Sequence, residues 1–249
     1  MNKADSMRNG SYYGLGAMEG SARGDGNVEG RIALMDSLVA LRGQHLLDIG
    51  CGNGVYTLRM LEGFDEAVGI DIEPDRLAHF RGTAGAAAVS VLECSATDVP
   101  FEDQTFDAVT AIETMEHLGE YLTGTLSEIS RVLRPGGSFY LTTPNRWWPL
   151  EQHGFMLRGK VRPGWRFPFL TWIPAVHRRF SVNDAFTPGR LDRLVQAHGF
   201  ERTGLAYMWP PLDRHPALNR RLRPALTLLQ KTPLRRFAQT LVMTYERVR

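Results

Sequence analysis

The stretch Leu46-Leu47-Asp48-Ile49-Gly50-Cys51-Gly52-Asn53-Gly54 joins an apolar strand to a turn that contains three alternating glycines. Glycine has no Cβ atom, so this turn can adopt backbone dihedrals closed to other residues and lets a ligand approach the backbone closely. Residues 55–61 can then begin a helix whose free N–H groups face that ligand. The sequence therefore predicts a nucleotide-bearing cofactor at this turn.

The spacing of the glycines disfavours a dinucleotide. The fingerprint G-x-G-x-x-G requires glycine or alanine three positions after Gly52, where this chain has Val55. A second strand over residues 67–71 ends on Asp71. The separation of this acid from the glycine turn along the sequence suits a residue that hydrogen-bonds two ribose hydroxyls. Since several nucleotide-binding families share such an acid, the segments further along the chain must decide between them.

Three downstream segments complete the pattern. They are VPF at 99–101, FDAV at 106–109, and LRPGG at 133–137 before a strand over 138–143. In this order and spacing, residues 45–145 resemble the class I S-adenosylmethionine (SAM) dependent methyltransferases of the type 11 group. The resemblance implies SAM as the cofactor and an α/β fold, a doubly wound, mostly parallel seven-stranded sheet with an antiparallel last strand.

Composition indicates a soluble enzyme of one domain. The chain has 249 residues, of which 43% are hydrophobic and 22% charged, and this is ordinary for a globular protein. The net charge of +2 indicates no particular partner and argues against nucleic acid. Two cysteines cannot build a disulfide framework, and no N-terminal segment resembles a signal peptide. We therefore expect a cytoplasmic protein.

The chain divides into a leading segment and one domain. Residues 1–27 are rich in Gly, Ser and Asn, which predicts a flexible segment, and we expect its Tyr13 to close over the cofactor as part of a lid. Residues 28–249 form the methyltransferase-like domain, beginning with a helix over 28–41. Strands are expected at residues 44–49, 67–71, 88–93, 106–111, 138–143, 201–208 and 237–246.

Two inserts are additional to this core. A helical and aromatic cap at 145–186 should emerge beyond the carboxyl ends of the strands, where ligands of open α/β sheets bind. Its tryptophans can line an acceptor pocket or simply pack the insert onto the sheet. A basic helical insert at 210–236 can contact a membrane surface peripherally, bind an acidic partner, or expose a solvated basic face. The residues expected to contact the acceptor are Trp147, Trp148, Glu151 and Trp172.

The resemblance implies a role for each residue of the cofactor site. Asp48 corresponds to the acid that orients the methionine ammonium through the glycine turn, Asp71 to the ribose ligand, and Ile72 to the apolar contact with adenine. Relatives often carry an acid that accepts from the adenine amino group where this chain has Ser95, whose hydroxyl can accept the same bond without the charge. The expected set is Tyr13, Asp48, Gly50, Cys51, Gly52, Asp71, Ile72, Ser95, Ala96, Thr97, Ile112, Glu113 and His117.

The segment at 112–118, IETMEHL, is similar to the family's E-x-L-E-H motif. On a helix, Glu113, Glu116 and His117 would share one face. Such a group can orient a base or bind a divalent metal, or it can hold a structural histidine near the methionine end of the cofactor. We assign no metal.

A hydroxyl acceptor of high pKa would require a base within hydrogen-bonding reach. The candidates are His117, His153 and His177, because histidine titrates near neutral pH. We favour His153, since Glu151 could orient it or raise its pKa by charge pairing.

These observations predict SAM-dependent methyl transfer to a small or lipid-like acceptor, as O-methylation in specialised or cell-surface metabolite biosynthesis. Two alternatives stay open. One is methylation of nitrogen or carbon, and the other is a scaffold or cyclase that binds SAM without transferring its methyl group. The sequence also leaves the oligomeric state open.

Overall fold

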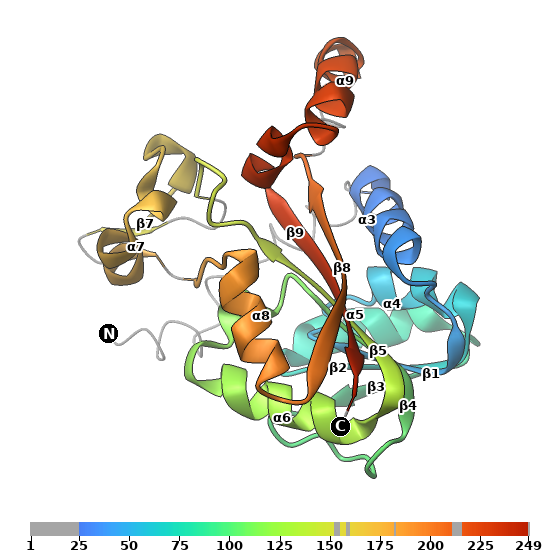
Figure 1. Cartoon of the computed structure of the whole chain (residues 1–249). Coiled ribbons are helices and arrows are strands. Elements are labelled where there is room, and N and C mark those ends of the chain that lie inside the picture. The colour runs from blue at the N-terminus through green and yellow to red at the C-terminus, as the bar shows by residue number, and fades with distance from the viewer. Residues whose placement is uncertain (1–24, 152–154, 158–159, 182, 211–215, 249) are drawn as a thin grey trace.

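A computed structural model describes residues 25–151, 155–157, 160–181, 183–210 and 216–248. Its centre is a seven-stranded sheet in the order β3-β2-β1-β4-β5-β9-β8 (Figure 1). The strands are β1 (Gly43–Ile49), β2 (Phe64–Asp71), β3 (Val89–Glu93), β4 (Phe106–Ile112), β5 (Leu133–Pro144), β8 (Phe200–Met208) and β9 (Thr240–Arg247). Strands β1 to β5 pair in parallel, whereas β9 is antiparallel to both β5 and β8. The predicted doubly wound sheet with an antiparallel last strand is confirmed.

Helices cover both faces of the sheet, because successive strand residues point to opposite sides. Leu46 of β1 packs in the same core cluster as Met35, whereas the next residue, Leu47, packs in the cluster that contains Leu126 and Leu191. The helices on the first face are α3 (Asp25–Leu38), α4 (Val55–Met60) and α5 (Pro74–Ala84). Those on the second are α6 (Leu122–Val132) and α8 (Pro188–Gln196).

Several predicted boundaries differ from the structure, among them those at the two ends of the domain. The first helix begins at Asp25, inside the segment expected to be flexible, and the rest of that segment, with Tyr13, lies outside the described residues. The last strand was expected from residue 237, but it begins at Thr240. Residues before it form the 3-10 helix η6 (Pro233–Phe237), because the Thr232 hydroxyl accepts from the Leu234 N–H and starts a helical turn.

The cap insert leaves the sheet at the carboxyl end of β5, and its two ends lie side by side. Asn145 and Phe186 form a bridge at its base, where the Arg146 N–H donates to the Phe186 carbonyl at 2.9 Å. The described cap elements are β6 (Phe155–Leu157), β7 (Lys160–Arg162), η4 (Gly164–Arg166), η5 (Leu170–Trp172) and α7 (Pro174–Phe180). The basic insert contains α9 (Pro216–Gln230), which projects beyond the end of β8 (Figure 1).

Short 3-10 helices complete the connections. They are η1 (Leu61–Gly63), η2 (Met115–His117) and η3 (Gly119–Tyr121). Among the helices in the described part of the chain, none has the length and apolarity needed to cross a bilayer.

Candidate functional site

The carboxyl ends of β1, β2 and β4 form the edge at which the expected cofactor residues gather. Because β2 lies on one side of β1 and β4 on the other, β1 and β4 flank the switch point where ligands bind in open α/β sheets. Asp71 is the last residue of β2 and Ile112 the last residue of β4, and each is followed by a further site residue, Ile72 and Glu113. The turn after β1 holds Gly50, Cys51 and Gly52, and the loop after β3 holds Ser95, Ala96 and Thr97.

The three glycines of the turn have different surroundings. A Cβ atom at Gly54 would lie 2.1 Å from the Phe80 ring, and one at Gly50 would lie 2.5 Å from Thr114 Oγ1, so both positions are closed by the protein's own packing. At Gly52 the nearest heavy atom would be Arg76 Nη1, at 3.9 Å. All three glycines have positive φ angles, which other residues adopt with strain. Gly52 is therefore where the turn leaves its backbone open to a ligand.

Cys51 lies within the same turn but is buried. Burial, with the charge of Asp48 next, raises the pKa of its thiol far above the usual range. The thiol is therefore a poor nucleophile, and its contact with a cofactor stays a prediction.

Asp71 ties the end of β2 to the glycine turn. Its Oδ2 accepts from the Gly52 N–H at 2.9 Å, and its Oδ1 accepts from the Glu73 N–H at 3.0 Å. Each carboxylate oxygen keeps a further lone pair for a ligand hydroxyl. The next residue, Ile72, has a side chain that is 67% exposed, so it offers an uncovered apolar surface beside this carboxylate.

Asp48 lies deeper, with only 2% of its surface exposed. Its two carboxylate oxygens accept from the hydroxyls of Thr57, at 2.6 Å, and Thr110, at 2.7 Å. Burial raises the pKa of Asp48 to about 6, against the opposing effect of these two hydrogen bonds. The Asp48 carboxylate thus connects α4, which follows the glycine turn, to β4, and its action on a ligand through the turn stays a prediction.

The loop after β3 lies beside Asp71, because the Cys94 N–H donates to the Asp71 carbonyl at 3.2 Å. Within this loop, the hydroxyls of Ser95 and Thr97 share a hydrogen bond of 2.8 Å, and Ser95 Oγ also accepts from the Thr97 N–H. Ala96 lies between them. The Ser95 hydroxyl expected to face adenine is thus held in a fixed position by a local turn.

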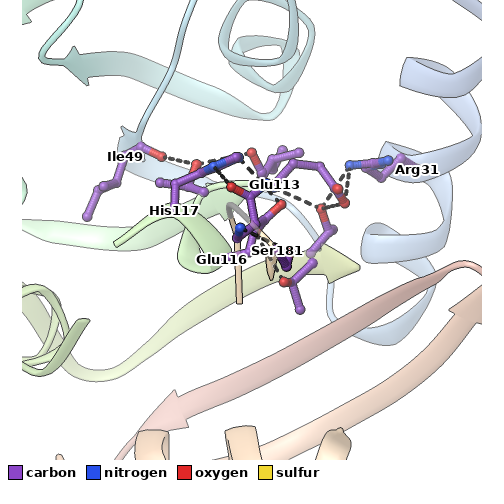
Figure 2. A network of polar contacts seen from close by, with 11 residues as sticks. Arg31, Ile49, Glu113, Glu116, His117 and Ser181 are labelled. Carbon is purple, nitrogen blue, oxygen red and sulfur yellow. Dashed lines mark hydrogen bonds and ion pairs between the residues drawn. The ribbon is translucent and has the colours of Figure 1, made fainter. Parts of the chain in front are cut away.

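The expected single helical face of Glu113, Glu116 and His117 is wrong. Glu113 has a φ of +50°, which breaks any helix at that residue, and only Met115–His117 form a 3-10 turn. The Glu113 side chain forms an ion pair with Arg31 of α3, whose Nη1 donates to Glu113 Oε1 and to Thr142 Oγ1, both at 2.9 Å (Figure 2). The carboxylate of Glu113 therefore faces α3 and β5. In the described residues, no group of three or more metal-binding side chains is found.

Glu116 is buried beneath this ion pair, with 1% of its surface exposed. Its Oε2 accepts from the Thr143 hydroxyl at 3.1 Å. Burial first, and then the negative charge of Glu113, raise the pKa of Glu116 well above its ordinary value. The surroundings therefore favour the uncharged form of this carboxyl group in the folded protein.

We expect Glu116→Gln to stabilise the protein increasingly as pH rises. A folded-state pKa above the ordinary 4.5 means that the native state binds more protons, so the wild type loses stability as pH rises above that value. The amide of Gln does not titrate, so the variant does not lose stability in this way. Thermal unfolding of both proteins from about pH 5 to about pH 9 checks the sign. The exposed control Glu120→Gln should show a constant difference in Tm from the wild type; a constant difference for Glu116→Gln would contradict the burial argument.

His117 has the geometry of an oriented imidazole. Its Nδ1 lies 3.2 Å from Asn183 Oδ1, and its Nε2 lies 3.8 Å from Glu116 Oε1 (Figure 2). Because an amide oxygen only accepts, this contact assigns the proton to Nδ1 and leaves the Nε2 lone pair to act as a base. Asn183 belongs to the end of the cap insert, and sequence reasoning missed it. The Asp184 N–H donates to the Glu116 carbonyl at 2.9 Å and fixes that end beside His117.

Of the other two candidate bases, the structure describes His177. His177 is 2% exposed, and its Nε2 lies 2.6 Å from Oε2 of Glu151, which is itself 6% exposed. This buried pair ties α7 to the start of the cap, which favours a structural role for both side chains. His153, which Glu151 was expected to orient, lies outside the described residues. A contact of Glu151 with the acceptor stays a prediction.

The cap tryptophans divide into two kinds. Trp147 and Trp172 are 41% and 39% exposed, and the Trp172 indole N–H donates to the Trp147 carbonyl at 3.1 Å. Trp148 is half-buried and packs edge-on against Trp209, which follows β8. The surroundings of Trp148 favour packing of the cap onto the sheet, whereas those of the other two leave aromatic surface for a ligand.

Comparison with protein families matches residues 47–141 to a family described as a methyltransferase domain. The match extends from β1 into β5 and so includes the glycine turn, Asp71 and Glu113.

Two curated relatives and one solved structure agree with this match. An O-methyltransferase of Aspergillus nomiae is 34% identical over 106 residues, covering 41% of this chain and 47% of that protein. A ubiquinone biosynthesis O-methyltransferase of Xanthomonas oryzae pv. oryzae is 31% identical over 119 residues, covering 47% and 49%. The chain thus spans about half the length of these curated relatives. A SAM-dependent methyltransferase structure from Mesorhizobium loti is 15% identical with a TM-score of 0.62, covering 86% of this chain and 96% of that one, and it shares the fold.

Proposed function

We propose that this chain, which belongs to the class I SAM-dependent methyltransferases, transfers the methyl group of SAM to an oxygen atom of a small or lipid-like acceptor. The observation that carries the proposal is the turn at Gly52, whose backbone is open to a ligand and is hydrogen-bonded to the Asp71 carboxylate. Methylation of oxygen is supported by the names of the relatives, which are O-methyltransferases.

The residues of the site fit SAM. Asp71 keeps lone pairs for the ribose hydroxyls, Ile72 presents apolar surface to adenine, and Gly52 allows close approach to the backbone. The Ser95 hydroxyl lies in the loop held beside Asp71 and can accept from the adenine amino group. When bound, SAM supplies a methyl group already activated by its sulfonium charge.

The protein's own task is then to position an acceptor and to remove its proton. His117, whose Nδ1 is held by Asn183, is the base that the geometry favours for a hydroxyl acceptor. Exposed aromatic side chains of the cap can bind the acceptor and exclude water from the transfer. An amine acceptor depends much less on a base, so the loss of His117 would slow methylation of nitrogen much less than methylation of oxygen.

Direct assay tests the proposal. The full chain is incubated with SAM and a panel of quinols, phenols and fatty acids, while S-adenosylhomocysteine and the mass of each acceptor are measured. We expect one acceptor to gain a single methyl group as S-adenosylhomocysteine forms. Methylation of an amine or a carbon would show that oxygen is not the acceptor atom. SAM binding by calorimetry without turnover on any class of acceptor would favour the scaffold or cyclase, and no SAM binding would overturn the proposal.

Two tryptophan variants separate acceptor binding from packing. We expect Trp172→Ala to raise the acceptor KM about tenfold and leave SAM affinity unchanged, because an exposed ring of the cap is lost. Trp148→Ala should instead lower the free energy of unfolding by about 2 kcal/mol, since it removes a half-buried ring from Trp209. Steady-state kinetics, calorimetry and denaturant unfolding of both variants give the comparison. Equal losses of stability and SAM binding in Trp172→Ala would favour packing for that residue as well.

A further inference from the structure

Charge is divided unevenly between the two inserts and the rest of the chain. Residues 145–186 and 210–236 hold 14 of the 29 Lys and Arg residues but 3 of the 27 Asp and Glu residues, a net charge of +11. The remaining residues therefore carry −9, although the whole chain carries only +2. Asn145 brings the inserts together, because its Nδ2 donates to the carbonyls of Arg236 and Ala238, both at 2.7 Å. The two inserts that carry this charge therefore meet where β5 ends.

Exposed apolar side chains connect the same two inserts. The Trp172 ring of the cap lies 4.7 Å from the Phe169 ring and 6.1 Å from the Phe237 ring of η6, measured between centroids. On either side of this junction, Phe169 is 50% exposed, Ile173 54% and Leu234 51%. Connected apolar surface of this kind commonly marks a binding face.

Helix α9 extends this surface away from the body of the protein (Figure 1). Leu218 and Leu222 lie on one face of the helix, where they are 43% and 40% exposed. Arg220 and Arg223 lie on the opposite face and are exposed, with Arg221 beside the leucines. The C-terminal end is anchored by a side-chain hydrogen bond from Gln230 Nε2 to the Tyr207 carbonyl at 2.7 Å. These residues together are called the docking surface below: Phe169, Trp172, Ile173, Leu234 and the exposed leucines and arginines of α9.

We propose that this docking surface binds peripherally to an anionic lipid bilayer. Aromatic and leucine side chains insert at the boundary between headgroups and acyl chains, while neighbouring arginines contact anionic headgroups and pack their stems on the apolar surface. The aliphatic side chains of Ile173 and Leu234 favour acyl chains over the bases of a nucleic acid, which bind by stacking on aromatic rings. Binding would bring the cap to the membrane surface, although the inference does not depend on methyl transfer.

Flotation of the full chain with vesicles tests the proposal. We expect strong binding to phosphatidylcholine vesicles that contain about 30% phosphatidylglycerol, weak binding to phosphatidylcholine alone, and loss of binding at high salt. Arg220→Glu with Arg221→Glu should weaken binding at least about tenfold. Ile173→Ser with Leu234→Ser should weaken it as well. The matched control is Arg42→Glu with Arg193→Glu, two exposed arginines away from the docking surface, and it should bind nearly as the wild type does.

Three results would overturn the proposal. The first is equal binding to both kinds of vesicle, and the second is a loss in the control variant as large as that in the α9 variant. The third is binding of a single-stranded RNA oligonucleotide in place of vesicles, which would assign the basic surface to nucleic acid. SAM affinity and Tm, measured for every variant, separate misfolding from lost lipid binding. They also separate this proposal from methyl transfer, because a chain that binds SAM but no vesicles contradicts only the lipid inference.

Discussion

Replacing His117 with Asn should lower turnover by about 10²- to 10⁴-fold and leave SAM affinity nearly unchanged. The reason is that Asn183 Oδ1, 3.2 Å from Nδ1, accepts the hydrogen bond of the Nδ1 proton, so the Nε2 lone pair is the proton acceptor that we propose. Asn cannot take a proton from an acceptor hydroxyl. Single-turnover rates at saturating SAM and calorimetric titration with SAM measure the two quantities. The rate should fall while the SAM Kd stays nearly constant.

Asn183 supplies the test of positioning. Asn183→Leu should lower kcat without changing the acceptor KM, because the imidazole loses the partner that fixes its tautomer. Asn183→Asp keeps an oxygen acceptor for the Nδ1 proton and should restore most of the rate. A structural role alone would lower Tm in both variants and would not produce this rescue.

The remaining histidines serve as comparisons. His177→Asn should lower stability, because it breaks the buried contact with Glu151, and should affect the rate of correctly folded protein only slightly. His153→Asn tests the residue that the sequence favoured. Near-normal rates in all three variants would exclude a histidine base and would support a nitrogen acceptor or catalysis by positioning alone.

Asp71→Ala should weaken SAM binding by about 1.5 to 3 kcal/mol, which is roughly a 10- to 150-fold rise in Kd. Two effects add in this variant. The ribose hydroxyls lose a charged acceptor, and the Gly52 N–H loses the carboxylate that holds the glycine turn in place. Calorimetric titration with SAM measures the change directly.

Asp75→Ala is the matched control, since it removes an exposed acid from the first turn of α5, four residues away. It should leave the SAM Kd within about twofold, because exposed charges are strongly screened. Asp71→Asn, which keeps one acceptor oxygen, should fall between the wild type and Asp71→Ala. Unchanged affinity in Asp71→Ala would contradict its assignment to the ribose.

The sequence by itself determined the sheet and the glycine turn, because both depend on local patterns. Alternating apolar strands and helices predict a parallel doubly wound sheet, and the spacing of Gly50, Gly52 and Gly54 before a helix predicts the open turn. Asp71 follows from the same logic, since an acid at the end of the second parallel strand must lie at the same edge as the turn.

Only the tertiary structure decided the partners around His117 and Glu113, because these partners are distant in the chain and follow no periodic pattern. Arg31 lies 82 residues before Glu113 and forms an ion pair with it, and Glu113 has the left-handed conformation that ends the expected helix. Asn183 lies 66 residues after His117 and reaches it only because the cap insert returns to the sheet. A side chain chooses its hydrogen-bond partner among the groups that folding brings within about 3 Å, and local sequence does not record that choice.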